Sequence, residues 1–382
     1  MSRAAKLCPG CAATRFSAPY RIARQPVILN YRFGTRAAAL GLKRRDILLR
    51  QCAGCGLIFN ATFDISLIPY DENYENRQCF SPAFQEHLAA LTDSLIERYD
   101  LRGKRILEIG CGKGDFLRLL CQRAGATGVG YDTSYEGPAR RGPVRFFARY
   151  VAQADIREPF DAVICRHVVE HIGPIGAFLQ ELHGIAHACG NPVTAIETPA
   201  FEWIAEHACF WDVFYEHCNY FPMPTLAHLA QLAGFSVTGQ RAVFGGQYQL
   251  LELHAADRPR KVAPPKKTVR LAPFAHAAGK AAAQFARGLA KLPGRRRWAI
   301  WGAGAKGVCL VNRLRGFRPQ FVIDSNPAKQ GCFIPGSAVR VIAPDAAAIA
   351  GLDAVFIANP KYQQEITAVL DEIGFNGEIR VL

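Results

Sequence analysis

Two pairs of cysteines near the N-terminus have the spacing of metal ligands. Cys8 and Cys11 flank a Pro-Gly pair, and Cys52 and Cys55 flank an Ala-Gly pair. Two residues between thiolates let one turn present both sulfurs to the same ion, so two such turns complete a tetrahedral zinc site. Four thiolates leave no open position for a substrate, so we expect one structural zinc that stabilises a segment too small for its own core. The alternative is four ordinary reduced cysteines.

A cofactor-binding turn is the second chemical feature of the sequence. Residues 106–114 read Ile-Leu-Glu-Ile-Gly-Cys-Gly-Lys-Gly, which is an apolar strand followed by a glycine-rich turn. Glycine lets the backbone approach a ligand that any side chain would block. The pattern E-x-G-x-G-x-G differs from the G-x-G-x-x-G of dinucleotide sites and resembles motif I of the class I S-adenosylmethionine (SAM) methyltransferases. This resemblance implies cofactor contacts from Glu108, Gly110, Cys111, Gly112 and Gly114.

Acids and histidines follow at the places where such a domain needs them. Asp132 ends the next expected strand, where a carboxylate can accept hydrogen bonds from ribose hydroxyls. Asp155 is expected in the loop beside the adenine, and His167 and His171 follow a later strand near the SAM pocket. The alternative is an ordinary nucleotide-binding turn with acids nearby by coincidence, but the ordered matches favour SAM.

A second glycine-rich turn lies in the C-terminal part of the chain. Residues 302–307 read Gly-Ala-Gly-Ala-Lys-Gly, and Asp324 follows about 20 residues on, as in dinucleotide-binding folds. Read alone, this turn indicates NAD and a reductase. A single motif of this kind is weak, however, and a helix N-terminus with Lys306 would also suit the diphosphate of another nucleotide.

The elements that must position these residues alternate in type, as a doubly wound α/β sheet requires. Strands are expected at 105–110, 127–132, 161–166 and 192–199, with a closing pair at 235–243 and 245–255. Helices are expected at 81–100, 116–125, 175–190 and 274–292. We predict a zinc-binding module at 1–75, a SAM methyltransferase domain at 76–256, and a basic linker helix with a Rossmann-like domain at 257–382.

The positive charge of the chain is concentrated in one segment. The 382 residues carry a net charge of +14, and residues 258–297 hold 12 of the 46 lysines and arginines but no Asp or Glu. A solvated linker and helix face explains this run, so we expect a small-molecule substrate and no nucleic-acid partner. A zinc-dependent RNA-binding or RNA-modifying protein is the alternative of another class.

No apolar run is long enough to span a membrane and no signal core precedes Cys8, so we expect a cytoplasmic protein of undetermined oligomeric state.

Four further segments extend the resemblance to most of the chain. They are Tyr-Asp-Glu-Asn-Tyr at 70–74, Phe-Tyr-Glu-His-Cys-Asn-Tyr-Phe at 214–221, Phe-Gly-Gly-Gln-Tyr at 244–248, and Phe-Val-Ile-Asp-Ser-Asn-Pro-Ala-Lys-Gln-Gly at 321–331. With the cysteine pairs and both glycine-rich turns, their order resembles the SAM-dependent C-methyltransferases of nucleotide-linked ketosugars. The resemblance implies that the C-terminal domain holds the nucleotide sugar and that no dinucleotide is needed.

The resemblance also implies the catalytic groups. In that family the tyrosine and histidine of a Tyr-x-His segment lie at the reacting carbon, and they map onto Tyr215 and His217, with Glu216 between them. Carbon becomes nucleophilic as an enolate, so a neutral imidazole can remove the proton beside a ketone while a hydroxyl donates to the oxyanion. Further implied contacts are Tyr74, as a lid over SAM or sugar, and Gly246, Gln247 and Lys306 for the acceptor.

Two other interpretations of these residues stay open. By residue type alone, His217 is better explained as a hydrogen-bonded core histidine. An O- or N-methyltransferase that acts on another small molecule needs no enolate, so it would make less use of His217.

Overall fold

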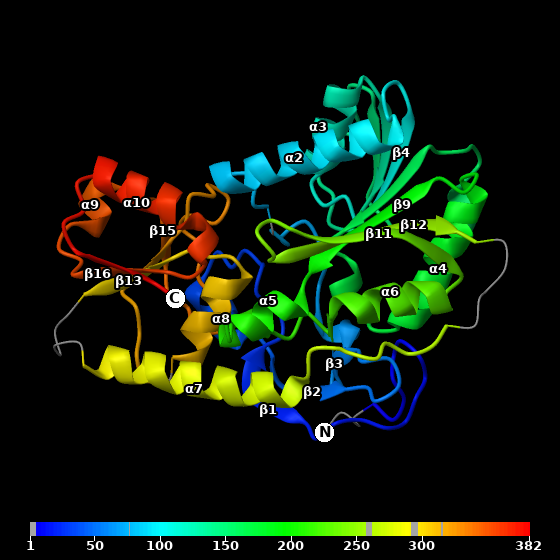
Figure 1. The fold of residues 1–382 in the computed structure, drawn as a ribbon. Coiled ribbons are helices and arrows are strands. Elements are labelled where there is room, and N and C mark those ends of the chain that lie inside the picture. Colours follow the sequence, from blue (N-terminus) through cyan, green and yellow to red (C-terminus); the bar gives the residue numbers. More distant parts are fainter. Residues whose placement is uncertain (1–4, 76, 257–261, 292–296, 315) are drawn as a thin grey trace.

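The computed structural model describes residues 5–75, 77–256, 262–291, 297–314 and 316–382 (Figure 1). Within these residues the chain forms sheets of four, eight and five strands. Figure 1 shows the C-terminal domain beside the central sheet, with the N-terminal module below both. Three parts of the chain therefore meet around one central region.

The central sheet carries the first glycine-rich turn. Its strands run in the order β11-β12-β9-β8-β4-β5-β7-β6, and those from β9 to β7 are parallel. Their bounds are β4 (Arg105–Ile109), β5 (Thr127–Tyr131), β6 (Arg140–Arg141), β7 (Val144–Phe147), β8 (Ala162–Arg166), β9 (Val193–Pro199), β11 (Phe235–Val243) and β12 (Tyr248–Ala255). The chain order reverses between β4 and β8, and in such sheets a ligand binds outside the carboxyl ends of the strands at this switch point.

Helices cover both faces of the central sheet, which explains why its inner strands β4 and β8 are mostly apolar. Helices α2 (Pro82–Tyr99) and α3 (Asp115–Ala124) lie on one face, and α4 (Ile175–Ala188) and α6 (Met223–Leu232) lie on the other (Figure 1). Helix α2 begins after Ser81, whose hydroxyl accepts a hydrogen bond from the Phe84 amide at 3.1 Å. Pro82 suits the first turn because that position needs no intrahelical N–H bond.

The N-terminal module closes on a strand from the middle of the chain. Its antiparallel strands are β1 (Tyr20–Pro26), β2 (Arg44–Gln51), β3 (Ile58–Asn60) and β10 (Asn219–Tyr220), with the short helix α1 (Arg36–Gly41) between β1 and β2. Because β10 pairs with β3, the module also fixes the segment that precedes β10 and contains His217. The module expected at 1–75 thus shares its sheet with residues 219–220.

The C-terminal domain is a second parallel sheet, in the order β15-β14-β13-β16-β17. Its elements are β13 (Trp298–Trp301), α8 (Ala305–Arg313), β14 (Phe321–Ile323), β15 (Val341–Ile342), α9 (Ala346–Ile349), β16 (Ala354–Ile357), α10 (Gln363–Glu372) and β17 (Glu378–Val381). Helix α7 (Leu271–Ala290) contacts β1 and α5 (Phe201–Glu206). One hydrophobic core includes Phe201, Phe274 and Val308, so it joins the C-terminal domain to the rest of the molecule.

The predicted fold class is confirmed, since the central sheet is doubly wound and has a second Rossmann-like sheet beside it. Each strand and helix that the sequence predicted is present to within a few residues, although the end of the helix expected at 274–292 lies outside the described residues. The structure adds β1, β2, β3, β6, β7, β10 and β15, which the sequence did not locate. None of the described helices is long and apolar enough to cross a membrane.

Candidate active site

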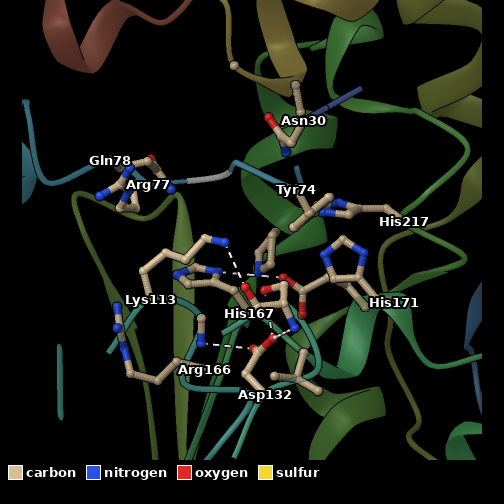
Figure 2. Close-up of a pocket in the computed structure, with 18 of the residues that line it drawn as sticks. Asn30, Tyr74, Arg77, Gln78, Lys113, Asp132, Arg166, His167, His171 and His217 are labelled. Atoms are coloured by element: carbon tan, nitrogen blue, oxygen red, sulfur yellow. Dashed lines mark hydrogen bonds and ion pairs between the residues drawn. The ribbon is translucent and has the colours of Figure 1, made fainter. Parts of the chain in front are cut away.

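A cavity of about 920 Å³ is lined by both glycine-rich turns (Figure 2). The first turn lines it from Glu108 to Lys113, and the second contributes Trp301 and Gly302 together with residues 304–307. The loop that leads into α2 lines it with Tyr70, Tyr74 and residues 77–81. A ligand at one turn therefore shares one space with a ligand at the other.

The first turn has the backbone shape that only glycine adopts without strain. Gly110, Gly112 and Gly114 have φ values of +74°, +54° and +81°. A Cβ atom at Gly110 would lie 2.1 Å from Val168 Cγ2, whereas nothing lies within 4 Å of one at Gly112. The space over Gly112 is thus free for a ligand to approach the backbone.

Asp132 is held at the edge of the cavity by its own loop. Its Oδ2 accepts a hydrogen bond from the Gly112 amide at 2.8 Å, and its Oδ1 accepts from the Ser134 amide and hydroxyl, both at 2.7 Å. Each carboxylate oxygen has further lone pairs, so the oriented group can still accept hydrogen bonds from a ribose. Asp155 has another position: it binds Arg149 at 2.6 and 2.8 Å, and Arg149 rather than Asp155 lines the cavity.

A buried ion-pair network lies behind the first turn. Glu197 accepts a hydrogen bond from Arg166 Nε at 2.5 Å and lies 2.6 Å from His87 Nε2. Burial alone would raise the pKa of Glu197, but Arg166 and His87 together lower it, so the carboxylate stays ionised. His167, which follows Arg166 in the sequence, has a φ of +53°. Non-glycine residues adopt this strained backbone conformation mainly in turns and at functional sites.

The imidazole of His217 lies in the cavity without a hydrogen-bond partner among the described residues. Its ring centroid is 4.8 Å from that of His171 and 4.0 Å from that of Phe214. Burial, with the charges of His171, His167 and Lys306, holds the pKa of His217 well below its usual value. His171 differs, since its Nδ1 lies 3.0 Å from the Tyr70 hydroxyl. His217 is therefore a neutral imidazole with free ring nitrogens at neutral pH.

The two residues before His217 point away from the cavity. The Tyr215 hydroxyl accepts a hydrogen bond from the Asp64 amide at 3.0 Å and donates to the Thr62 carbonyl at 3.1 Å. Glu216 accepts from the Leu29 amide at 2.7 Å, and burial raises the pKa of Glu216 to about 8. Neither residue lines the cavity, whereas Phe214 does.

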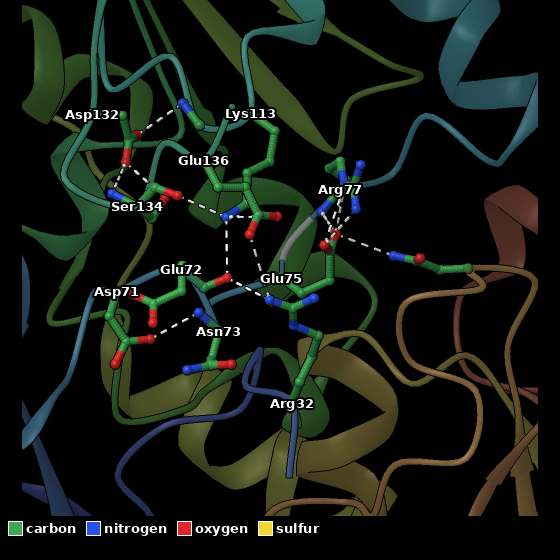
Figure 3. Close-up of polar contacts among 12 residues, drawn as sticks. Arg32, Asp71, Glu72, Asn73, Glu75, Arg77, Lys113, Asp132, Ser134 and Glu136 are labelled. Carbon is green, nitrogen blue, oxygen red and sulfur yellow. Dashed lines mark hydrogen bonds and ion pairs between the residues drawn. The ribbon is translucent and has the colours of Figure 1, made fainter. Parts of the chain in front are cut away.

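The loop at 70–75 is tied to the first glycine-rich turn by Lys113 (Figure 3). The Lys113 ammonium donates to the Glu72 carbonyl at 3.3 Å and to the Ser134 carbonyl at 2.7 Å, and it lies 3.3 Å from the Glu136 carboxylate. Arg32 donates to the same Glu72 carbonyl at 2.6 Å. Because Ser134 also binds Asp132, this network connects the loop to the expected ribose carboxylate.

The second turn repeats the geometry of the first. Asp324 Oδ2 accepts a hydrogen bond from the Ala303 amide at 2.6 Å, as Asp132 does from Gly112. A Cβ at Gly307 would lie 1.8 Å from the Gly302 carbonyl oxygen, so α8 packs on the turn only with glycine there. Lys306 lines the cavity but is paired with Asp212, and its ammonium lies 4.7 Å from the Trp203 ring centroid.

The cysteine pairs form a compact cluster. The sulfurs of Cys8 and Cys55 and those of Cys11 and Cys52 are 3.6 Å apart, close to the ~3.8 Å edge of a tetrahedron with Zn–S distances of about 2.3 Å. The cluster is therefore compatible with zinc. The Gly176 amide at the start of α4 donates to the Pro9 carbonyl at 2.9 Å, so this turn packs directly on the central domain.

A second group of metal-ligand type lies in the cavity. Ligand atoms of Glu170, His171 and His217 lie within 4.8 Å of one another. Glu170 already accepts a hydrogen bond from the Thr198 hydroxyl at 2.9 Å and lies 3.5 Å from His167 Nδ1. These contacts already occupy part of the carboxylate of Glu170, which distinguishes this group from the four-cysteine cluster.

Comparison with protein families decides the class of the central domain. Residues 84–240 match the family model described as a methyltransferase domain, and residues 259–381 match the C-methyltransferase C-terminal domain. Residues 84–240 form a methyltransferase domain. Its glycine-rich turn, Asp132 and the β4–β8 switch point are among the parts of the domain that open into the cavity.

Curated relatives match only part of this chain. A ubiquinone biosynthesis O-methyltransferase of Rhodopseudomonas palustris (strain HaA2) is 38% identical over 106 residues, which are 25% of this chain and 40% of the relative. Another, of Bradyrhizobium sp. (strain ORS 278), is 39% identical over 90 residues, which are 21% of this chain and 34% of the relative. The chain thus spans less than half the length of these relatives.

Solved structures match a larger share of this chain. The Burkholderia thailandensis 1,6-didemethyltoxoflavin-N1-methyltransferase with bound S-adenosylhomocysteine is 20% identical, with a TM-score of 0.35, and covers 46% of this chain and 80% of its own. The Synechocystis PCC 6803 magnesium protoporphyrin IX methyltransferase with bound SAM is 17% identical, with a TM-score of 0.34, and covers 46% and 80%.

The cavity brings together most of the residues that the sequence singled out. Those that line it are Tyr74, Glu108, Gly110, Cys111, Gly112, Asp132, His167, His171, His217, Gln247 and Lys306. Those that do not are Gly114, Asp155, Tyr215, Glu216 and Gly246. Sequence reasoning missed Tyr70, Lys113 and Arg166 as site residues, although each lies inside or next to a motif that it had recognised.

Proposed function

We propose that this protein transfers the methyl group of SAM to a carbon atom of a nucleotide-linked ketosugar, with His217 as the base. The observation that carries the proposal is the single cavity, which joins the SAM turn to the second nucleotide-type turn and has His217 in its wall. A donor and an acceptor that each carry a nucleotide need two such turns in one space. The match to a C-methyltransferase C-terminal domain agrees with transfer to carbon.

The proposed chemistry uses His217 and Tyr74 in the protonation states that burial favours. Neutral His217 takes the proton from the carbon beside the ketone. The resulting enolate carbon attacks the methyl group of SAM, and the rest of SAM leaves as S-adenosylhomocysteine. The Tyr74 hydroxyl donates to the enolate oxygen in place of Tyr215, whose hydroxyl is bound to backbone outside the cavity. Burial, with the charge of Glu216, keeps the pKa of Tyr74 well above its usual value, so this hydroxyl retains its proton.

The zinc ion of this proposal is structural. Cys8, Cys11, Cys52 and Cys55 hold it and thereby fix a turn against α4, and none of the four lines the cavity. A closed set of four thiolates supplies no chemistry to the transfer.

The test is a panel of nucleotide ketosugars, each incubated with SAM and analysed by mass for the gain of one methyl group. An acceptor deuterated beside the ketone should lose deuterium to water when S-adenosylhomocysteine occupies the SAM site. His217→Ala should abolish this exchange and slow transfer by about 100- to 10,000-fold. Tyr215→Phe is the matched control and should exchange normally, because its hydroxyl contacts only the backbone of residues 62 and 64.

An O-methyltransferase is the second candidate, and the ubiquinone biosynthesis O-methyltransferases among the relatives favour it. Transfer to oxygen requires no carbanion. Methylation without any exchange at carbon, or near-normal turnover by His217→Ala, would therefore reject the ketosugar reaction and support transfer to oxygen.

A further inference from the structure

The carboxylate after the second glycine-rich turn is held in the same way as the one after the first. Asp324 Oδ2 accepts from the Ala303 amide of the turn at 2.6 Å, and its Oδ1 accepts from the Asn326 amide at 2.8 Å. Asp132 makes the same two contacts, with an amide of its turn at 2.8 Å and with the amide two residues further on at 2.7 Å. Both carboxylates are partly exposed and line the cavity. Asp324 therefore lies where a doubly wound sheet binds the ribose of a nucleotide.

Gly304 lacks a side chain at a point where the protein itself would accept one. Its φ of −78° and ψ of 177° are extended values that any residue adopts, and a Cβ there would meet no atom within 4 Å. Gly304 lines the cavity and precedes α8, whose N-terminus has no side-chain cap. The free space over Gly304 therefore lets a phosphate approach the unbonded N–H groups of the first helical turn.

Lys329 places a buried positive charge beside the same turn. The residue is 8% exposed and lines the cavity, and its ammonium donates to the Ala303 carbonyl at 3.1 Å. It forms no ion pair with the described residues, whereas Lys306, the lysine of the turn itself, pairs with Asp212. An ammonium has three donors, and its burial without an anion costs free energy. Lys329 therefore indicates an anionic ligand at this turn.

The opposite charges of Lys329 and Asp324 require a ligand with two different parts. Lys329 and the N-terminus of α8 attract phosphate, whereas the Asp324 carboxylate repels phosphate and accepts hydrogen bonds from hydroxyl groups. A nucleotide carries both parts, since its ribose hydroxyls are donors. In doubly wound folds an acid at the position of Asp324 contacts the 2′-hydroxyl of the ribose.

We infer that the second turn binds a ribonucleoside diphosphate, with Lys329 at the diphosphate and Asp324 accepting a hydrogen bond from the ribose 2′-hydroxyl. The inference rests on the proposed function, in which this turn holds the nucleotide of the acceptor. It adds that the ketosugar is carried by a ribonucleotide and not by a 2′-deoxyribonucleotide.

The test compares ligands that differ only at the 2′ position, with saturating S-adenosylhomocysteine present to occupy the first turn. The probes are ADP, CDP, GDP and UDP, and the one that binds most tightly is compared with its 2′-deoxy and 2′-deoxy-2′-fluoro forms. Neither hydrogen nor fluorine at this position can donate a hydrogen bond. Calorimetry on the wild-type protein should show both analogues bound about 10- to 100-fold more weakly, as expected for the loss of a hydrogen bond to a charged group.

Asp324→Ala should bind the three forms with affinities within about twofold of one another, because the acceptor of the 2′-hydroxyl is gone. Asp345→Ala is the matched control. It removes a carboxylate of the same domain that accepts from the Ala348 amide at 3.1 Å and lies outside the cavity, so it should keep the wild-type preference.

Two further variants test the diphosphate part. Lys329→Met should weaken all three forms at least about 10-fold and leave the 2′ preference unchanged. Gly304→Ala should also weaken all three, with no fall in melting temperature, because its methyl group enters the free space over the turn.

The outcomes separate this inference from the proposed function. Equal binding of the 2′-hydroxyl and 2′-deoxy forms by the wild-type protein, or an unchanged preference in Asp324→Ala, would overturn the inference. Tighter binding of dTDP than of every ribonucleoside diphosphate would overturn it as well, and so would tighter binding of NADH. Wild-type protein that binds none of these nucleotides would overturn the nucleotide-linked acceptor of the proposed function itself.

Discussion

Alanine substitutions at Gly110 and Gly112 should separate the two roles of the first glycine-rich turn. Both residues have positive φ, +74° and +54°, where an alanine costs roughly 1–2 kcal/mol relative to glycine. Their surroundings differ. A Cβ at Gly110 would lie 2.1 Å from Val168 Cγ2, and one at Gly112 would meet no atom within 4 Å.

The expected magnitudes follow from this difference. Gly110→Ala should lose the backbone strain plus an overpacking cost of about 1–3 kcal/mol, which gives a fall of about 2–5 kcal/mol in the free energy of unfolding. Gly112→Ala should lose only the strain. Its methyl group occupies space in the cavity where the cofactor meets the backbone, so its affinity for S-adenosylhomocysteine should fall at least about 10-fold.

Urea unfolding with linear extrapolation and calorimetric titration of S-adenosylhomocysteine measure the two quantities. Gly125→Ala is a control with similar strain, since its φ is +59° and a Cβ there would be in open space after α3, away from the cavity. Val168→Ala should restore part of the stability of Gly110→Ala. The reasoning is refuted if Gly112→Ala binds as tightly as Gly125→Ala, or if Gly110→Ala is as stable as Gly112→Ala.

Three further predictions concern the metal, a loop and a buried acid. Replacing Cys8 and Cys52 together by Ser should reduce zinc from about one ion per chain to background in elemental analysis and lower the melting temperature, whereas retained zinc would reject the cluster. Lys113→Met should speed amide hydrogen exchange at residues 71–75, because the ammonium holds their loop to Ser134, and unchanged exchange would contradict this role. The pKa of Glu216 is raised from 4.5 to about 8, so between these values the native state binds more protons than the unfolded chain and stability falls as pH rises. Glu216→Gln should remove that loss, and an equal melting-temperature difference from wild type at pH 5 and pH 8 would count against it.

The elements around the first turn follow from local sequence. Residues 105–109 and 127–131 are strands that helices cover on both faces. Strands in that position are rich in buried residues, so the sequence pattern alone indicates them. The positive φ values of Gly110 and Gly112 are likewise a property of the glycine pattern itself. The sequence was sufficient for these elements because the backbone conformation of each residue is set by its own type and by its neighbours in the chain.

The direction of a side chain in an irregular segment depends on what packs on each side. The sequence favoured Tyr215 as the oxyanion donor, but residues 215–216 form a turn, so Tyr215 does not share the direction of His217. Pairing of β10 with β3 fixes this segment so that Phe214 and His217 line the cavity while Tyr215 faces the backbone of residues 62 and 64. No local pattern could have settled this choice.

The sequence by itself determined the two glycine-rich turns, the acids that follow them and the four-cysteine cluster, because each depends on residue type at a fixed spacing. Only the tertiary structure decided that both turns open into one cavity and that Lys113 ties the loop at 70–75 to the first glycine-rich turn. The same holds for Arg166, whose unpartnered N–H exists because β4, β8 and β9 bury it between Glu108 and Glu197. Such properties arise from burial and from contacts between residues distant in sequence, so the spacing of residues along the chain does not predict them.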